Sequence, residues 1–234
     1  MQNNHLFDFT AGETILVNKP FRWTSFDVVN KIRYTAKTHL GIPRLKIGHA
    51  GTLDPLATGL LILCTGKHTK LIENYQNLEK EYSGTIRLGA STPSFDLETE
   101  IDRHFPFEHI TLTDVEKTAE KLSGEIMQIP PVYSAIKIDG RRAFDFARNE
   151  EDLKLNARQV HIHSFRIESY NPPDVRFRII CSKGTYIRSI ARDLGQLLSS
   201  GAHLAALHRD RIGDFSSAEA FDLEALIAML TQPQ

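Results

Sequence analysis

Hydrophobic side chains recur along this chain with two periods, about two residues and about 3.6 residues, which indicate strands and helices respectively. Alternation with many β-branched side chains is typical of strands. Spacing of three to four residues is typical of helices that bury one face. The pattern predicts strands at residues 14–17, 82–88, 160–167 and 175–181, and helices at residues 115–122 and 222–230 and onward from Thr24 and Thr185.

Two of the predicted helices carry signals for their ends or their buried faces. Thr24 and Asp27 have the spacing of a capping box, so the first of these helices is expected to be capped by Thr24. Its buried stripe is expected to comprise Phe26, Val29, Ile32 and Ala36. In the helix after Thr185, Arg188 and Arg192 are expected to lie off the apolar face formed by Ile187, Ile190, Ala191, Leu194 and Leu198.

The order of these elements is irregular, which favours an α+β fold over repeated βαβ units. No internal repeat and no Pro/Gly/Ser-rich linker divides the chain, so a single domain of residues 1–234 is predicted. Residues 124–150 mix aromatic and basic side chains between turn signals at Pro130-Pro131 and Asp139-Gly140. We interpret this stretch as an exposed excursion with a short helix near residues 143–148.

The composition is that of an ordinary globular protein, with 41% hydrophobic and 24% charged residues. The apolar run from Leu60 to Cys64 is far too short to cross a bilayer, and the N-terminal segment lacks a secretory signal pattern. Cys64 and Cys181 lie in apolar sequence and are expected to be reduced core residues. These features predict a cytoplasmic protein with no membrane partner.

The formal net charge of −1 gives no general attraction to nucleic acid. A basic stretch without an acidic residue nevertheless contains Lys31, Arg33, Lys37, Arg44 and Lys46. A solvated face is the simpler interpretation of such a stretch. Charge therefore neither supports nor excludes an RNA partner.

The most informative segment for chemistry is the loop from Gly48 to Gly59. Its glycines permit unusual backbone torsions, and among them lie one imidazole, His49, and one carboxylate, Asp54, followed by Pro55. A carboxylate on a rigid loop can serve as a nucleophile or general base. Residue types and spacing alone favour the simpler role, a turn or capping residue before proline.

Other candidate sites are weaker. His161 and His163 share a strand face but have no convincing third ligand, so no metal is predicted. Tyr186 and Arg188 lie at a predicted strand-to-helix junction, a place that commonly borders a cleft. Arg188 can pair with a buried carboxylate or be a solvated helix residue, and Tyr186 can equally be a core aromatic.

Six segments together resemble the TruB family of bacterial tRNA pseudouridine synthases, in the family's order and over nearly the whole chain. The aspartate segment, His49 and Gly51 followed by Leu53 through Gly59, is highly specific by itself. The resemblance therefore overrides the simpler interpretation of Asp54. The segments are Lys19-Pro20 with Trp23-Thr24-Ser25, Gly48 to Gly59, Lys80 with Tyr82, Gln128 to Ala135, Gly184 to Arg188, and Gly201 to Leu207.

The resemblance implies the pseudouridine synthase fold, a mixed and mostly antiparallel sheet flanked by helices, with residues 124–150 as the thumb insertion. It implies that Asp54 is the nucleophile, that Arg188 pairs with it, and that Tyr82 stacks on the flipped base. Tyr186 and Leu207 would line the uracil pocket, and His49 would contact the RNA.

The implied reaction is isomerisation of uridine 55 in the TΨC loop of tRNA by a monomer, without cofactor, metal or guide RNA. Three routes remain open: attack of Asp54 at C6 of the base, attack at C1′ of the sugar, and abstraction of the 2′ proton to give a glycal.

Two departures from the family pattern stand out. Thr99 occupies a position, three residues after Asp96, where the family usually carries glycine, so the loop after Leu88 is expected to run differently. No C-terminal RNA-binding domain of the PUA type is expected after the catalytic region, which would weaken or redistribute the tRNA contacts.

Three other classes of protein remain as alternatives. They are a guide-RNA-directed catalytic subunit, a tRNA-folding module without catalysis, and a nucleoside glycosidase that releases free uracil.

Overall fold

The structure is a computed structural model, and it describes residues 7–134, 137–138, 141–142 and 155–232. The chain divides into two compact units, Met1–Glu81 with His208–Gln234 (unit 1) and Tyr82–Leu207 (unit 2). Two strands have residues in both units, β4 (Lys80–Leu88) and β12 (Ala202–Ile212).

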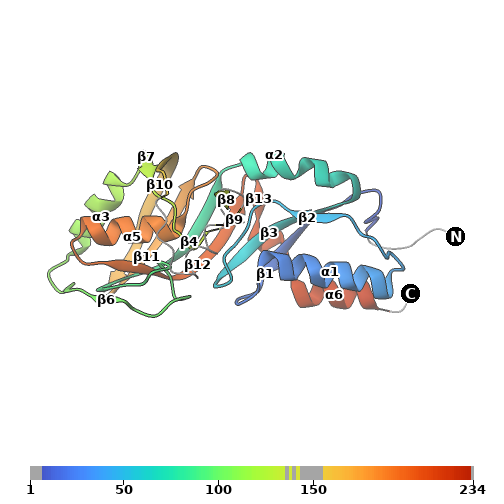
Figure 1. The fold of residues 1–234 in the computed structure, drawn as a ribbon, viewed down its shortest axis with the longest axis horizontal. Helices are drawn as coiled ribbons and strands as arrows, with labels where there is room; N and C mark the ends of the chain where they lie inside the picture. Colours follow the sequence, from blue (N-terminus) through green and yellow to red (C-terminus); the bar gives the residue numbers. More distant parts are fainter. Residues whose placement is uncertain (1–6, 135–136, 139–140, 143–154, 233–234) are drawn as a thin grey trace. The chain divides into compact units, whose positions relative to one another are not determined.

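Unit 1 is built on the strand order β14-β1-β3-β12, with β2 beside β3 and β13 beside β12 (Figure 1). Strands β1 and β3 are antiparallel, with Val17 opposite Leu61, whereas β1 and β14 are parallel. The bounds are β1 (Thr14–Lys19), β2 (Ile47–His49), β3 (Ala57–Thr65), β13 (Phe215–Ser216), β14 (Phe221–Asp222), α1 (Ser25–His39), α2 (Ile72–Asn77) and α6 (Leu223–Thr231), with 3₁₀ turns at Gly66–Leu71 and Ser217–Glu219.

The uninterrupted apolar run in β3 follows from burial on both faces of the sheet. Successive side chains of a strand point to opposite faces. Leu61 and Leu63 therefore join one cluster with α1 and α6, while Leu60 and Ile62 join another that includes side chains of α2. Figure 1 shows α1 and α6 side by side and α2 across the strands from them.

Helix α1 confirms the predicted capping box and corrects the predicted buried stripe. Thr24 caps the helix and exchanges hydrogen bonds with Asp27. Val28, rather than Phe26, completes the buried face with the other predicted side chains. Phe26 is 58% exposed and therefore does not belong to the buried face.

Unit 2 has the strand order β12-β4-β11-β10-β7, with α3 and α5 packed beside each other (Figure 1). Strands β10 and β11 form an antiparallel hairpin in which Phe165 lies opposite Ile179. The bounds are β7 (Gly124–Gln128), β10 (Arg158–Asn171), β11 (Asp174–Cys181), α3 (Leu112–Lys121) and α5 (Ile187–Leu197), with the small pairs β5 (Ala90–Ser91) with β6 (Arg103–His104) and β8 (Lys137–Ile138) with β9 (Arg141–Arg142).

Several expectations from the sequence are confirmed, and one besides the stripe of α1 needs correction. The predicted strands and helices are present, and the arrangement is the predicted mixed, mostly antiparallel sheet flanked by helices. Both cysteines are buried and free. Residues 124–128, however, form β7 of the large sheet, so the exposed excursion cannot begin before residue 129. The short helix expected near residues 143–148 lies outside the described residues.

Arg188 is only 3% exposed, so of the two alternatives left open by the sequence it is not a solvated helix residue. Ser189 and Ile190, which follow it in α5, are also inaccessible. Among the described helices, none has the length and apolar character needed to span a membrane.

Candidate active site

The candidate nucleophile Asp54 lies on a short connection between β2 and β3, residues 50–56, which we call the Asp54 loop. Gly51 and Gly59 have φ angles of +107° and +101°, which side chains other than glycine rarely tolerate. A Cβ at Gly59 would also overlap the backbone of Arg209 on β12. These two glycines therefore let the loop close tightly against the neighbouring strand.

The N-terminus of α1 is joined directly to the Asp54 loop. The Oγ atom of Ser25 accepts a hydrogen bond from the Leu53 amide at 2.9 Å, and this serine is buried. The amide of Arg22 donates to the Pro55 carbonyl at 2.8 Å. Both residues that flank Asp54 are thus fixed by the segment that begins α1.

Arg209 holds the loop from the other side. Its guanidinium is 1% exposed and donates to three backbone carbonyls, those of Leu60 at 2.7 Å, Gly51 at 3.1 Å and Thr52 at 3.4 Å. A guanidinium presents its donors in a fixed fork, so these bonds set the position of the loop backbone.

Lys19, also 1% exposed, places a second buried cation beside the loop. Its Nζ donates to the carbonyls of Pro20 at 2.9 Å, Trp23 at 2.5 Å and Pro55 at 3.2 Å. Burial lowers the pKa of Lys19 to about 8, and the carboxylate of Asp54 partly opposes that shift. The charged amine of Lys19 and the carboxylate of Asp54 therefore attract each other.

His49 lies at the end of β2, half-buried. Burial lowers the pKa of this histidine, and the positive charge of Arg209 lowers it further. The imidazole is therefore neutral at pH 7, able to accept or donate a hydrogen bond without carrying charge.

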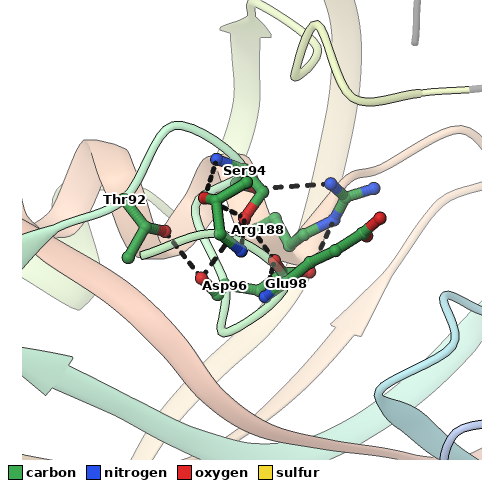
Figure 2. A network of polar contacts seen from close by, with 6 residues as sticks. Thr92, Ser94, Asp96, Glu98 and Arg188 are labelled. Atoms are coloured by element: carbon green, nitrogen blue, oxygen red, sulfur yellow. Dashed lines mark hydrogen bonds and ion pairs between the residues drawn. The ribbon is translucent and has the colours of Figure 1, made fainter. Parts of the chain in front are cut away.

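In unit 2, Arg188 forms an ion pair with Asp96, with Nε 3.7 Å from Oδ2 (Figure 2). Its Nη1 also donates to the Ser94 carbonyl at 3.2 Å. Both charged side chains are almost inaccessible to water. The expectation that Arg188 pairs with a buried carboxylate is confirmed for Asp96.

The carboxylate of Asp96 is itself fixed by the loop around it. Ser94 Oγ donates to its Oδ1 at 2.6 Å, and the Glu98 amide donates to the same atom at 3.0 Å. Thr99 contributes a hydroxyl 2.8 Å from Ser94 Oγ. Thr99 is thus part of the network that positions Asp96.

Tyr186 stands at the N-terminus of α5, and its backbone is clamped by one buried side chain. The Tyr186 amide donates to Gln128 Oε1 at 2.8 Å, and Gln128 Nε2 donates to the Tyr186 carbonyl at 3.1 Å. Gln128 is at the end of β7 and is 1% exposed. This reciprocal pair fixes the start of the helix that carries Arg188.

The predicted site residues are distributed over both units. Asp54 and His49 belong to unit 1, whereas the other four belong to unit 2. Tyr82 is buried in β4, and Leu207 is half-buried in β12. Contact between Asp54 and Arg188, and the uracil pocket itself, stay predictions.

Sequence reasoning assigned no role to Lys19, Gln128 or Arg209. A signal for Lys19 was available: β1 alternates, and Lys19 continues the buried series of Ile15 and Val17. A lysine on the apolar side of a strand needs partners, and the turn after Pro20 supplies them. Nothing comparable marks Arg209, because its partners are backbone atoms distant in sequence.

Comparison with solved structures identifies the class of protein. A chain of the "Cbf5-Nop10-Gar1 Complex" matches with a TM-score of 0.71 and 26% identity over 94% of this chain and 54% of that chain. A chain of the "H/ACA RNP bound to a substrate RNA containing 2'-deoxyuridine" has the same fold, with a TM-score of 0.67 and 24% identity, and 53% of its length is covered. The chain thus spans about half of these solved chains. The fold is that of the pseudouridine synthases.

The chain belongs to the TruB family of pseudouridylate synthases. The model of the family's N-terminal domain matches residues 36–187, and that of the tRNA pseudouridylate synthase B C-terminal domain matches residues 188–233. The tRNA pseudouridine synthase B of Phocaeicola vulgatus is 51% identical over 97% of both chains. The protein of the same name from Flavobacterium johnsoniae is 49% identical over 92% of this chain and 95% of its own.

Proposed function

We propose that this protein converts uridine to pseudouridine at position 55 in the TΨC loop of tRNA. Relatives with about half of their residues identical, over nearly their full length, carry the name tRNA pseudouridine synthase B. The structural observation that carries the proposal is the Asp54 loop. Its backbone is fixed by Ser25, Lys19 and Arg209, which is the rigidity that a nucleophilic carboxylate requires.

The target base must first leave its stack in the folded RNA, which costs a few kcal/mol. In the proposed enzyme, the aromatic rings of Tyr82 and Tyr186 and the side chain of Leu207 receive the uracil. Stacking on an aromatic side chain returns about 1–3 kcal/mol per base, so the flipped state becomes accessible. His49, kept neutral by burial, contacts the RNA next to the vacated position.

Asp54 then acts on the uridine as a carboxylate. It attacks C6 of the ring or C1′ of the sugar, or it removes the 2′ proton to form a glycal, and each route frees the uracil to turn and rejoin through C5. Arg188 and Lys19 supply positive charge, which compensates the negative charge of the carboxylate in a dry pocket. Substrate and product are isomers, so the reaction needs no electron or group donor and no cofactor.

The protein is proposed to act as a monomer on free tRNA, with the thumb of residues 129–150 pressing on the RNA. A second candidate, dependence on a guide RNA, is suggested by the likeness to chains of H/ACA complexes. The identity to those chains is about half of that to the tRNA enzymes, which favours free tRNA.

The test uses an unmodified tRNA transcript and the purified protein, without added cofactor or second RNA. The expected result is one pseudouridine, at position 55, and none in a transcript that carries cytidine there. Product only after addition of a guide RNA would instead support the guide-dependent candidate. Release of free uracil would overturn the isomerase assignment.

A further inference from the structure

Three large aromatic side chains on α1 or just before it are exposed instead of packing toward the sheet. Phe26 and Tyr34 on the helix are 58% and 63% exposed, and Phe21 just before it is 55% exposed. Phe26, Asn30 and Tyr34 are spaced four residues apart, so they follow one line along the helix. We call the surface formed by Phe26, Asn30, Tyr34, Lys31 and Lys37 the α1 outer face. Exposed aromatic side chains that are grouped on one face of a helix indicate a binding surface.

The charged side chains that border the exposed ring of Tyr34 are basic. Lys31 lies three residues before Tyr34 and Lys37 lies three after it, so both side chains border the exposed ring. The acidic residue of the helix, Asp27, is occupied in the capping box, where its carboxylate accepts from the amide and hydroxyl of Thr24. The neighbouring helix α6 adds the exposed Glu224 near its own N-terminus.

The N-terminal end of α1 lies next to the candidate catalytic residue. Ser25 and Arg22 bond directly to the residues on either side of Asp54. From there α1 continues for 15 residues, which corresponds to about 22 Å of helix. The α1 outer face is therefore long enough to follow several nucleotides of one RNA strand, because successive phosphates of a helical strand advance about 3.4 Å along the axis.

We propose that the α1 outer face binds the tRNA beside the reacting uridine, with the lysines on backbone phosphates and with Phe26 or Tyr34 stacked on an unpaired base. This inference rests on the proposed function. The alternation of lysine with exposed aromatic rings suits RNA. RNA phosphates attract the lysines, and unpaired bases stack on the aromatic rings. A protein partner fits less well, since lysine is depleted at protein interfaces.

The first test replaces both lysines, Lys31→Gln with Lys37→Gln, and measures the dissociation constant of the tRNA transcript at several salt concentrations. Each lost phosphate contact should reduce the slope of log affinity against log salt by about 0.7–0.9. The single-turnover rate at saturating tRNA should stay at the wild-type value. The matched control is Lys117→Gln with Lys121→Gln on α3, which are also exposed and should leave the slope unchanged.

The second test replaces the rings. Phe26→Ala or Tyr34→Ala should weaken tRNA binding by about 5- to 150-fold, the range measured for a stacked base. Tyr34→Phe keeps the ring and should bind as the wild type does. Leu112→Ala, at a 45% exposed apolar position of α3, is the matched control.

Unchanged affinity and salt slope in both sets of variants, with active enzyme, would overturn the proposed surface. A wild-type protein that forms no pseudouridine would instead overturn the proposed function, so the two failures are distinguishable.

Discussion

Buried charges and the groups that compensate them define the candidate site at the scale of single residues. Lys19, Arg188 and Arg209 are each 3% exposed or less, although burying an isolated charge is costly. Lys19 and Arg209 each donate to three backbone carbonyls, and Arg188 meets Asp96. Because each charge is tied to its partners, the backbone around the candidate reactive groups has little freedom to move.

The pair of Arg188 and Asp96 yields a direct prediction. Asp96→Asn preserves the shape of the side chain but removes the carboxylate that lies 3.7 Å from a buried guanidinium. The free energy of unfolding should fall by about 3 kcal/mol, measured by urea denaturation, and the single-turnover rate should fall at least about tenfold. The control is Asp174→Asn, which breaks the exposed 2.7 Å pair with Arg87 and should cost less than about 1 kcal/mol. Equal activity of the two variants would exclude a positioning role for Asp96.

Lys19 yields a prediction about pH. Its pKa is about 8, so the amine loses its proton, one of three hydrogen bonds and its charge near Asp54 as the pH rises past that value. The single-turnover rate should therefore decline between pH 7 and pH 9 with a midpoint near 8.

Stability should change in the opposite direction over that range. The ordinary pKa of lysine, 10.5, is higher than the folded value, so the unfolded chain binds this proton more tightly. The contribution of Lys19 to the free energy of unfolding is therefore lowest below pH 8 and rises toward pH 10.5. Thermal melts at the same pH values separate the two effects. A rate that stays constant to pH 9 would rule out the role assigned to the charged amine.

At the scale of elements, α1 serves both the core and the candidate site. Its inner face packs on β1 and β3, and its first residue bonds to the Asp54 loop. The sequence pattern found the helix and its cap, because both are local signals. It placed Phe26 wrongly, because a three-to-four residue spacing accommodates either Phe26 or Val28 and only packing against the sheet decides between them.

Two neighbouring substitutions separate helix stability from loop positioning. Thr24→Ala removes the exposed cap and should cost about 1 kcal/mol in unfolding free energy, with an unchanged single-turnover rate. Ser25→Ala should cost about 1–3 kcal/mol, because it leaves the buried Leu53 amide without its acceptor, and it should also slow turnover. Equal rates in the two variants would show that the serine has no influence on Asp54.

For the whole molecule, the sequence revealed the elements with strong local patterns and missed those defined by distant partners. The β3 run was conspicuous because both faces of the strand are buried. Strand β12 was not predicted, because its residues mix buried apolar, polar and charged side chains, and its place in the sheet depends on β3 and β4. The assignment of residues 124–128 to the excursion instead of a strand failed for the same reason, since β7 is recognisable only through its pairing with β10.

The same distinction applies to the candidate site. The glycines, Asp54 and Arg188 could be identified because they form contiguous motifs that resemble a family. Arg209 could not, because its role consists of bonds to carbonyls 149 to 158 residues away. Asp96 was noticed only as a reference for Thr99, and its partnership with Arg188 spans two elements of unit 2.

The central claim is that the ionised side chain of Asp54 performs the chemistry. The most direct measurement uses tRNA transcript tritiated at C5 of uridine, because this hydrogen is lost when the base rejoins through C5. The account predicts that the wild-type protein releases tritium into water without free uracil, and that Asp54→Asn still binds the tRNA but releases none. Tritium release by Asp54→Asn at the wild-type rate would contradict the account.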